Sequence, residues 1–318
     1  MNRCQSASVV VAGAVLGLTA LPCMAMTRSV DCDEGQTIQA AIETATTRAD
    51  RLEIFVTGTC NEDLIVRRAA ITIDGGGAAT VVGRVSIFAD NVWLYNLTIT
   101  GPGRGVSIGS GNARLWSVAL VGNGGEGLRA ASNSSVWIRD SQVTDNDGPG
   151  IVVEDSQVRV QDTSVSNNGS HGIALAFNSQ ADVSGCNISE NGDAGILLTA
   201  GSQANIDNNV INGNAGHGIN GYLHTTVVLH GNEIAYNASA GVVGFGRTTV
   251  QIGGAQVNYN GDGGIGLSAG STLILEEPAT TLIGNTGAAL WCGDAQSYVH
   301  NLALLDTEGD KACREFGW

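Results

Sequence analysis

A glycine followed by a branched apolar residue recurs along this chain every 22 or 23 residues. The eight copies are Gly105-Val106, Gly127-Leu128, Gly150-Ile151, Gly172-Ile173, Gly195-Ile196, Gly218-Ile219, Gly241-Val242 and Gly264-Ile265. Seven of these glycines follow an asparagine by four residues: Asn123, Asn146, Asn168, Asn191, Asn214, Asn237 and Asn260. A period this regular predicts one supersecondary unit stacked on itself, so most of the chain is expected to form a solenoid.

One repeat, from Gly195 to Gly218, contains three short runs in which inward and outward positions alternate. The inward positions are Ile196 and Leu198 in the first run, Ala204 and Ile206 in the second, and Asn209 and Ile211 in the third. No room remains for a helix between the runs. Three strands in about 23 residues, each stacked on its counterpart about 4.8 Å away in the next turn, predict a parallel β-helix.

The predicted fold class is therefore all-β: a right-handed, single-stranded parallel β-helix of about ten coils with a short N-terminal helical cap. The right-handed winding follows from the crossover preference of parallel strands. Coils stacked at the usual strand spacing give a rod on the order of 50 Å long.

Two columns of turn residues support this register. The residues between the second and third strands tolerate a left-handed backbone, which suits a one-residue bend: Asp140, Asp162, Gly185, Asn208, Gly231 and Gly254. The asparagines that precede the repeated glycines form the other column. Amides stacked one coil apart can hydrogen-bond along such a column, so we interpret them as a structural ladder rather than as catalytic residues.

The composition narrows the classes of partner. Forty-five glycines stand against four prolines, and aromatic residues are scarce, so the core is expected to consist of Val, Ile, Leu and Ala. The formal net charge is −15, and Lys311 is the single lysine. Nucleic acid is disfavoured, because binding it requires a basic face. A strongly anionic glycan is also disfavoured unless a cation bridges it.

Residues 1–25 are interpreted as a signal peptide. Arg3 supplies a short positive region, and Val9–Leu21 is almost wholly apolar. That run is shorter than the ~20 residues that a membrane-spanning helix needs. Small residues in Cys23-Met24-Ala25 fit a cleavage site, so the mature chain is expected to begin near Met26 and to be secreted or periplasmic.

The remaining cysteines agree with an oxidising compartment. By position, two disulfides are predicted, Cys32 with Cys60 and Cys292 with Cys313, one at each end of the solenoid. Cys186 is left over on an inward position, where a buried, inert thiol is expected.

The chain divides into an N-terminal cap region over 26–63, a parallel β-helix over 64–290 and a C-terminal cap over 291–318. Apolar residues at helical spacing predict a short amphipathic helix over Thr37–Thr46, which would cover the open end of the stack. Strand-like runs follow it: Leu52–Val56, Leu64–Val66 and Ile71–Ile73.

The repeats resemble those of the right-handed parallel β-helix proteins of the pectate-lyase-like superfamily. The opening is similar too, in its segments Gln36-Thr37-Ile38-Gln39-Ala40-Ala41-Ile42, Val56-Thr57-Gly58-Thr59-Cys60-Asn61-Glu62 and Ile71-Thr72-Ile73-Asp74-Gly75. The resemblance covers roughly residues 32–290 and is specific for the fold. It implies no single activity, because the superfamily includes lyases, hydrolases, epimerases, esterases and non-catalytic surface proteins.

The resemblance directs attention to the outer face of the first strand and its following turn, where the family's catalytic sites lie. The 23-residue register places Tyr222 beside Phe245 and His224 beside Arg247. Stacked rings can bind sugar rings, His can act as a general base and Arg can neutralise a carboxylate. We therefore predict Tyr222, His224 and Arg247 as catalytic residues. The predicted substrate-binding residues are Asn220, Phe245, Glu154 and Arg129.

The alternative interpretation of these residues is structural: the two rings pack against each other, and His224 and Arg247 are ordinary surface residues. His171 and His217 are interpreted as turn residues, because they lie two coils apart. No convincing pair of glycosidase carboxylates, cluster of calcium-binding acids, zinc spacing or phosphate loop occurs in the sequence. We predict no cofactor, and calcium stays open without a clear site.

The function expected is recognition of an extracellular or periplasmic polysaccharide. Whether the protein also cleaves it stays open; an enzyme of this kind would be a polysaccharide lyase before a glycoside hydrolase or an epimerase. The competing class is a non-catalytic surface, assembly or adhesion protein. Its contact surface, which would also serve self-association, is an apolar outer stripe of Val152, Ala174, Leu197 and Val243.

Overall fold

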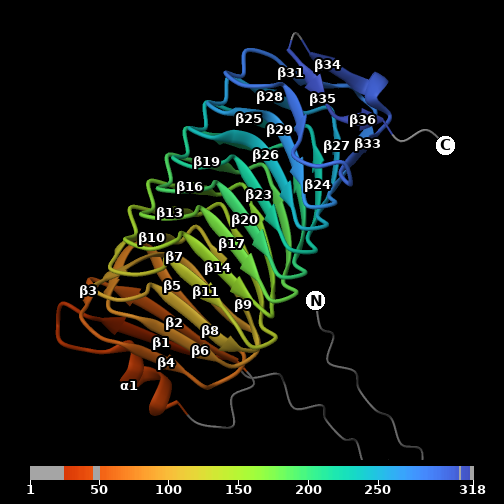
Figure 1. Ribbon diagram of the computed structural model, residues 1–318. Coiled ribbons are helices and arrows are strands. Elements are labelled where there is room, and N and C mark those ends of the chain that lie inside the picture. The colour runs from red at the N-terminus through yellow and green to blue at the C-terminus, as the bar shows by residue number, and fades with distance from the viewer. Residues whose placement is uncertain (1–24, 46–50, 308, 316–318) are drawn as a thin grey trace, which may run out of the picture.

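The computed structural model describes residues 25–45, 51–307 and 309–315. The described chain winds into an elongated rod of stacked coils (Figure 1). Each regular coil contains three short strands, and every strand pairs in parallel with its counterparts in the coils before and after it. The predicted signal peptide lies outside the described residues, apart from Ala25.

The first strands of the coils form one twelve-stranded parallel sheet. Its members are β4 (Leu64–Val66), β6 (Val85–Phe88), β8 (Val106–Ser110), β11 (Leu128–Ala130), β14 (Ile151–Glu154), β17 (Ile173–Ala176), β20 (Ile196–Thr199), β23 (Ile219–Tyr222), β26 (Ala240–Phe245), β29 (Gly263–Ser268), β32 (Leu290–Cys292) and β35 (Lys311–Ala312). The rod thus has about twelve turns rather than the ten predicted, because coils at both ends stack without carrying the glycine repeat.

The second and third strands make up a 24-stranded sheet that bends at each coil. The second-strand ladder contains β1 (Ala25–Asp31), β2 (Arg51–Thr57), β5 (Ile71–Val82), β7 (Val92–Gly101), β9 (Asn112–Trp116), β12 (Ser135–Arg139), β15 (Gln157–Gln161), β18 (Gln180–Ser184), β21 (Gln203–Asp207), β24 (Thr226–His230), β27 (Thr249–Gly253), β30 (Thr272–Glu276), β33 (Tyr298–His300) and β36 (Arg314–Glu315). The third strands are β3 (Thr59–Cys60), β10 (Ala119–Asn123), β13 (Gln142–Thr144), β16 (Ser164–Ser166), β19 (Asn187–Ser189), β22 (Val210–Asn212), β25 (Glu233–Ala235), β28 (Gln256–Asn258), β31 (Thr280–Leu282) and β34 (Leu305–Thr307). The long strands β5 and β7 run through both positions.

The core is a stack of aliphatic side chains in register along the rod. Ile173, Ile196 and Ile219, for example, are partners in adjacent coils, and all three are fully buried. Since each strand contributes only two or three inward side chains, an individual coil cannot bury its apolar face alone. The core therefore depends on the contacts between coils.

The asparagine column is a continuous buried ladder. The Asn168 amide donates to the Asn191 side-chain oxygen at 2.9 Å, and Asn191 donates to Asn214 at 2.9 Å. The repeated glycines are explained by the same ladder. A Cβ added at Gly195 would lie 2.9 Å from the Asn214 amide nitrogen and 2.8 Å from the Gly218 carbonyl oxygen. Glycine is required there because no space remains beside the ladder.

The bends between second and third strands have the predicted left-handed backbone. Their φ angles lie between 49° and 64°, at Asp140, Asp162, Gly185, Asn208, Gly231 and Gly254. Just after them, Cys186 is buried and free, as expected from its inward position. Burial raises the pKa of its thiol to about 11, which makes it a poor nucleophile at neutral pH.

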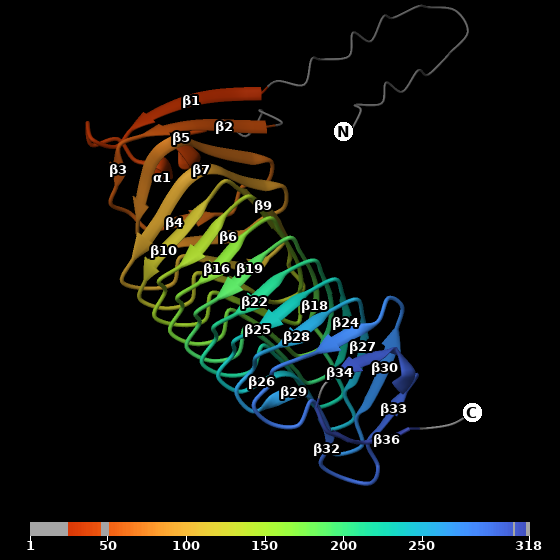
Figure 2. The same ribbon diagram turned by 90° about the horizontal axis from the view of Figure 1, so that it is seen from above.

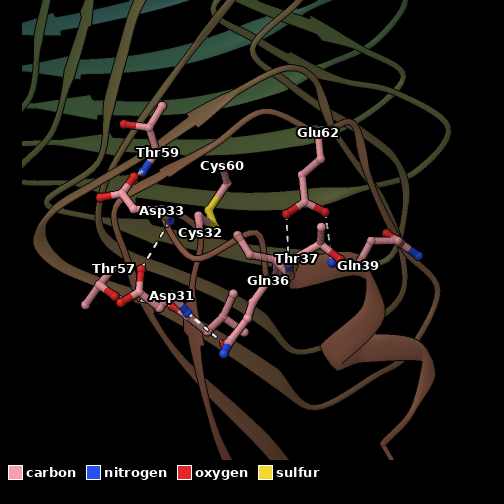
Figure 3. The surroundings of a disulfide bond; sticks show 12 residues. Asp31, Cys32, Asp33, Gln36, Thr37, Gln39, Thr57, Thr59, Cys60 and Glu62 are labelled. Carbon is pink, nitrogen blue, oxygen red and sulfur yellow. Dashed lines mark hydrogen bonds between the residues drawn. A yellow bond between two sulfur atoms is a disulfide. The ribbon is translucent and has the colours of Figure 1, made fainter.

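The N-terminal end of the rod carries one short helix, α1 (Ile38–Glu43). The Thr37 side chain caps it by accepting from the Ala40 amide, and the Glu62 carboxylate accepts from the amides of Ile38 and Gln39 (Figure 3). A disulfide joins Cys32 to Cys60 beside this cap (Figure 3).

A second disulfide, Cys292–Cys313, lies at the other end of the rod, where the chain also forms a 3₁₀ turn over Leu302–Leu304. Both disulfides are those predicted from position. Among the described residues, no helix has the length and apolar character that crossing a membrane requires.

Candidate functional site

The outer face of the first strands carries an exposed pair of aromatic rings. Tyr222 ends β23 and Phe245 ends β26, and the two residues are register partners. Their rings stack nearly parallel, with centroids 5.0 Å apart and an interplanar angle of 11°. The two residues remain 41% and 38% exposed. The two rings therefore form an exposed apolar stack that spans two adjacent coils.

His224 and Arg247 lie in the turns that follow these strands, one coil apart. Both are exposed, and neither side chain has a hydrogen-bond or ion-pair partner among the described residues. Their backbones are left-handed, with φ of 59° and 62°. Asn178, Gly201 and Gly270 occupy the same turn position with the same conformation. A non-glycine residue there costs about 1–2 kcal/mol, so the position suits Asn or Gly better than Arg.

Two of the predicted substrate-binding residues, Glu154 and Arg129, lie far from Tyr222 and Phe245, whereas Asn220 lies close to them. Asn220 lies on β23 itself, half-buried and two residues before Tyr222. Glu154 on β14 and Arg129 on β11 are three and four coils away, which is about 14–19 Å at the usual strand spacing. These seven predicted residues do not form one cluster.

Arg129 and Glu154 instead belong to an ion-pair chain. Arg129 pairs with Glu154 and, at 3.4 Å, with Glu126, which also accepts from Arg104 at 2.5 Å. Burial acts to raise the pKa of Glu126, but its hydrogen bonds and the two arginine charges outweigh it and lower the pKa. Arg129 is thus largely neutralised by neighbouring carboxylates.

A second aromatic pair was not found from the sequence. Tyr236 and Tyr259 stack at 5.4 Å and 8° in the turns that follow β25 and β28. They are 63% and 51% exposed, and both have a φ of 56°. Each directly precedes an asparagine of the ladder, so the 23-residue register could have revealed them. Together with Tyr222 and Phe245, they place two ring stacks on the same two coils.

The other sequence candidates occupy structural positions. Burial lowers the pKa of both His171 and His217, and the Nδ1 atom of His217 accepts from the Ala240 amide at 3.2 Å. Among the described residues, a single trio has potential ligand atoms close enough to share a metal ion: Cys32, Cys60 and Glu62. Its sulfurs are joined in the disulfide, and its carboxylate caps α1.

Comparison with known proteins establishes the family. The chain belongs to the family described as "Right handed beta helix region", whose model matches residues 69–228. The predicted right-handed winding and the pectate-lyase-like fold are confirmed. No curated protein sequence matches the chain.

Several solved structures share the fold at low sequence identity. The periplasmic alginate epimerase AlgG is 14% identical with a TM-score of 0.60, over 91% of this chain and 84% of that one. The Dettilon tailspike protein gp208 is 13% identical with a TM-score of 0.64, over 86% and 65%. The A-module of the mannuronan C-5 epimerase AlgE4 from Azotobacter vinelandii is 14% identical with a TM-score of 0.52, over 88% and 93%. At these identities the likeness concerns the fold.

Proposed function

We propose that this protein binds a polysaccharide on the outer face of its first strands. The observation that carries the proposal is the exposed stack of Tyr222 and Phe245. Buried aromatic pairs stabilise a core, but an exposed stack offers its ring edges and outer faces to the apolar face of a sugar. The second stack, Tyr236 with Tyr259, adds exposed rings to the same two coils, in the turns after their third strands. Two structurally similar proteins are named for alginate and mannuronan, which supports a polysaccharide as ligand.

Binding is tested with a double variant that removes the ring stack. Tyr222→Ala/Phe245→Ala is expected to weaken binding to immobilised polysaccharides by about tenfold or more, which corresponds to about 1.4 kcal/mol. Phe177→Ala is the matched control, because Phe177, in the turn after β17, is even more exposed, at 59%, but belongs to no ring stack among the described residues. Equal affinity of the double variant and the wild type would remove the proposal.

Cleavage would use lyase chemistry around Tyr222, His224 and Arg247. In this proposal Arg247 neutralises the carboxylate of a uronate, which acidifies the adjacent C–H. His224 takes that proton, and the C–O bond to the leaving sugar breaks as a C=C double bond forms. Tyr222 donates a proton to the leaving oxygen. His224 and Arg247 support these roles because both are exposed and unpaired among the described residues.

Cleavage is measured by the ultraviolet absorbance of the unsaturated product across a panel of uronate glycans. His224→Asn and Arg247→Asn remove the charge or base while keeping a residue that tolerates the left-handed turn. We expect each to abolish product formation without changing the fold. Binding without any product in the wild type would instead favour the non-catalytic surface protein, whose apolar stripe is half-buried on this face.

We also propose a secreted or periplasmic location. The two disulfides support it, because such bonds persist in oxidising compartments. Fractionation of cells that express the whole chain, with mass spectrometry of the N-terminus, tests both the location and the cleavage before Met26. An uncleaved cytoplasmic product would contradict it.

A further inference from the structure

A groove lies on a different face of the rod from the aromatic pair. It runs across the outer face of six second strands, β9, β12, β15, β18, β21 and β24, and has a volume of about 660 Å³. Figure 2 shows β9, β18 and β24 of this row following one another along the rod. Groove volumes of this size are typical of ligand sites.

The floor of the groove is one column of outward side chains in register, one from each coil. In order along the rod, the column is Arg114, Trp137, Arg159, Asp182, Asn205 and Val228, and Trp93 on β7 directly precedes it. The Arg114 guanidinium lies 4.3 Å from the ring centre of Trp93 and 6.0 Å from that of Trp137. Arg159 lies 5.7 Å from the ring of Trp137. The column therefore alternates flat aromatic faces with planar cations.

The second half of the column is a chain of hydrogen bonds. Arg159 donates to Asp182 at 3.1 Å, and Asn205 donates to the other oxygen of the same carboxylate at 3.0 Å. Arg159 is therefore paired. Arg114 has no carboxylate partner among the described residues, and its planar face already contacts the rings, so its N–H groups are available for an anion.

Unpaired indole donors lie on the strand of Arg114 and in the next coil, and free amides follow further along the groove. The indole N–H groups of Trp137, which lines the groove, and of Trp116, which lies outside its lining, are buried and have no acceptor among the described residues. Buried donors are normally satisfied, so a ligand oxygen reaching them would complete their hydrogen bonding. Along one rim, exposed side chains from three consecutive coils can bind hydroxyl groups: Gln157, Gln180 and Gln203.

The charge of the chain is unevenly distributed along the rod. Residues 51–159 contain nine arginines and eleven acidic residues, whereas residues 160–310 contain one arginine and thirteen acidic residues. The net charge of −15 therefore resides mainly in the C-terminal half. An anionic ligand is repelled there but not at the end of the groove that holds Arg114. The overall composition disfavours an anionic glycan, but this uneven distribution of charge permits one beside Arg114.

We propose that this groove is a second binding site, which holds an extended glycan strand bearing carboxylate groups, with its chain parallel to the rod axis. Successive sugars of an extended β-1,4-linked chain advance by nearly one coil, so each sugar can meet one rung. A carboxylate binds Arg114, a sugar oxygen accepts from the indole N–H of Trp137, and hydroxyl groups bind the glutamine rim and Asn205. The site is independent of the first-strand face and of any cleavage there.

The test compares two hexasaccharides of the same linkage by isothermal titration calorimetry. One is a β-1,4-glucuronate hexamer, and the other is cellohexaose, which lacks the carboxylates. We expect the glucuronate hexamer to bind at least about tenfold more tightly, with an affinity that falls as salt rises. Equal binding of the two, or no binding of the hexamer, overturns the proposal.

Variants locate the site. Arg114→Gln and Trp137→Ala are each expected to weaken hexamer binding by about tenfold. Gln180→Ala/Gln203→Ala provides a second variant at exposed positions that leaves the ring column intact. Arg84→Gln is the matched control, because Arg84 is exposed, lies outside the groove and makes no side-chain contact recorded among the described residues.

The same titrations separate the two faces. Tyr222→Ala/Phe245→Ala is expected to leave hexamer binding unchanged. If that variant abolishes binding while folded Arg114→Gln binds normally, the groove proposal fails and the first-strand face is the hexamer's site. If Arg114→Gln loses binding and the Tyr222/Phe245 variant does not, the groove proposal stands whatever becomes of the proposed function.

Discussion

The asparagine ladder offers the sharpest test of how this rod is stabilised, and Asn191→Ala is the perturbation. The Asn191 amide donates to the Val165 carbonyl at 3.1 Å and to the Asn214 side chain at 2.9 Å. Its oxygen accepts from the backbone N–H of Asn168 at 3.2 Å and from the Asn168 amide at 2.9 Å. Alanine removes all four bonds at a site with almost no exposure to water.

The expected loss follows from what is left unpaired. The Asn168 backbone N–H loses its acceptor, and a buried donor without a partner costs about 1–3 kcal/mol. The other lost bonds contribute about 0.5–1.5 kcal/mol each, partly offset because the Asn214 side-chain oxygen still accepts from the Asn191 backbone N–H. The free energy of unfolding should fall by about 2–5 kcal/mol, a large share of the 5–15 kcal/mol typical of a domain.

Urea denaturation followed by circular dichroism measures the loss, and Asn187→Ala is the matched control. Asn187 lies on the exposed side of β19 in the same coil, so its removal should change stability by no more than about 0.5 kcal/mol. Hydrogen exchange gives a local readout, since the Asn168 amide should lose protection in Asn191→Ala. Equal midpoints for the two variants, or unchanged exchange at Asn168, would refute the reasoning.

Three further predictions concern the glycine repeat, the buried thiol and the N-terminal disulfide. Gly195→Ala should destabilise the protein by about 1–3 kcal/mol in urea denaturation, because its Cβ would lie 2.7 Å from an Ile211 methyl group. Gly103→Ala is the control, because a Cβ there meets nothing within 4 Å. Similar losses of stability for both variants would contradict the packing argument. Burial raises the pKa of the folded Cys186 thiol to about 11, above the pKa of a thiol in the unfolded chain. The free energy of unfolding should therefore fall by on the order of 2–3 kcal/mol as pH rises from about 9 to 11. Cys186→Ala should lack this pH-dependent loss, and parallel pH profiles of the variant and the wild type would disprove the prediction. Replacing Cys32 and Cys60 with serine should lower stability by about 3–4 kcal/mol in thermal or urea unfolding, given a sequence separation of 28; an unchanged midpoint would count against it.

Much of the regular rod was predictable because each constraint acts between neighbouring coils. The spacing of Gly195 and Asn191 relative to their equivalents one coil away defines the stacking. Once the stacking is known, arithmetic places Tyr222 beside Phe245. The same arithmetic would have identified Tyr236 and Tyr259, had it been applied to the third turns.

Contacts in the irregular coils could not be predicted from the 22- or 23-residue spacing. The N-terminal strands carry no glycine repeat, and their pairing shifts register between Asp74 and Ala79 and between Ile87 and Phe88. Trp93 and Arg114 are register partners 21 residues apart, outside the repeat of 22 or 23, so their contact could not be read from the sequence. The two extra turns of the rod were missed for the same reason.

The sequence alone determined the coil, its three strands, its parallel stacking and its buried ladder, because these depend on residue type at a fixed spacing. Only the tertiary structure decided which outward side chains meet. Arg129 pairs with Glu154, while Arg114 lies between two indole rings without a carboxylate partner among the described residues. Outward rotamers depend on the side chains of the adjacent coils and on local register, and a repeat that specifies the backbone leaves them undetermined.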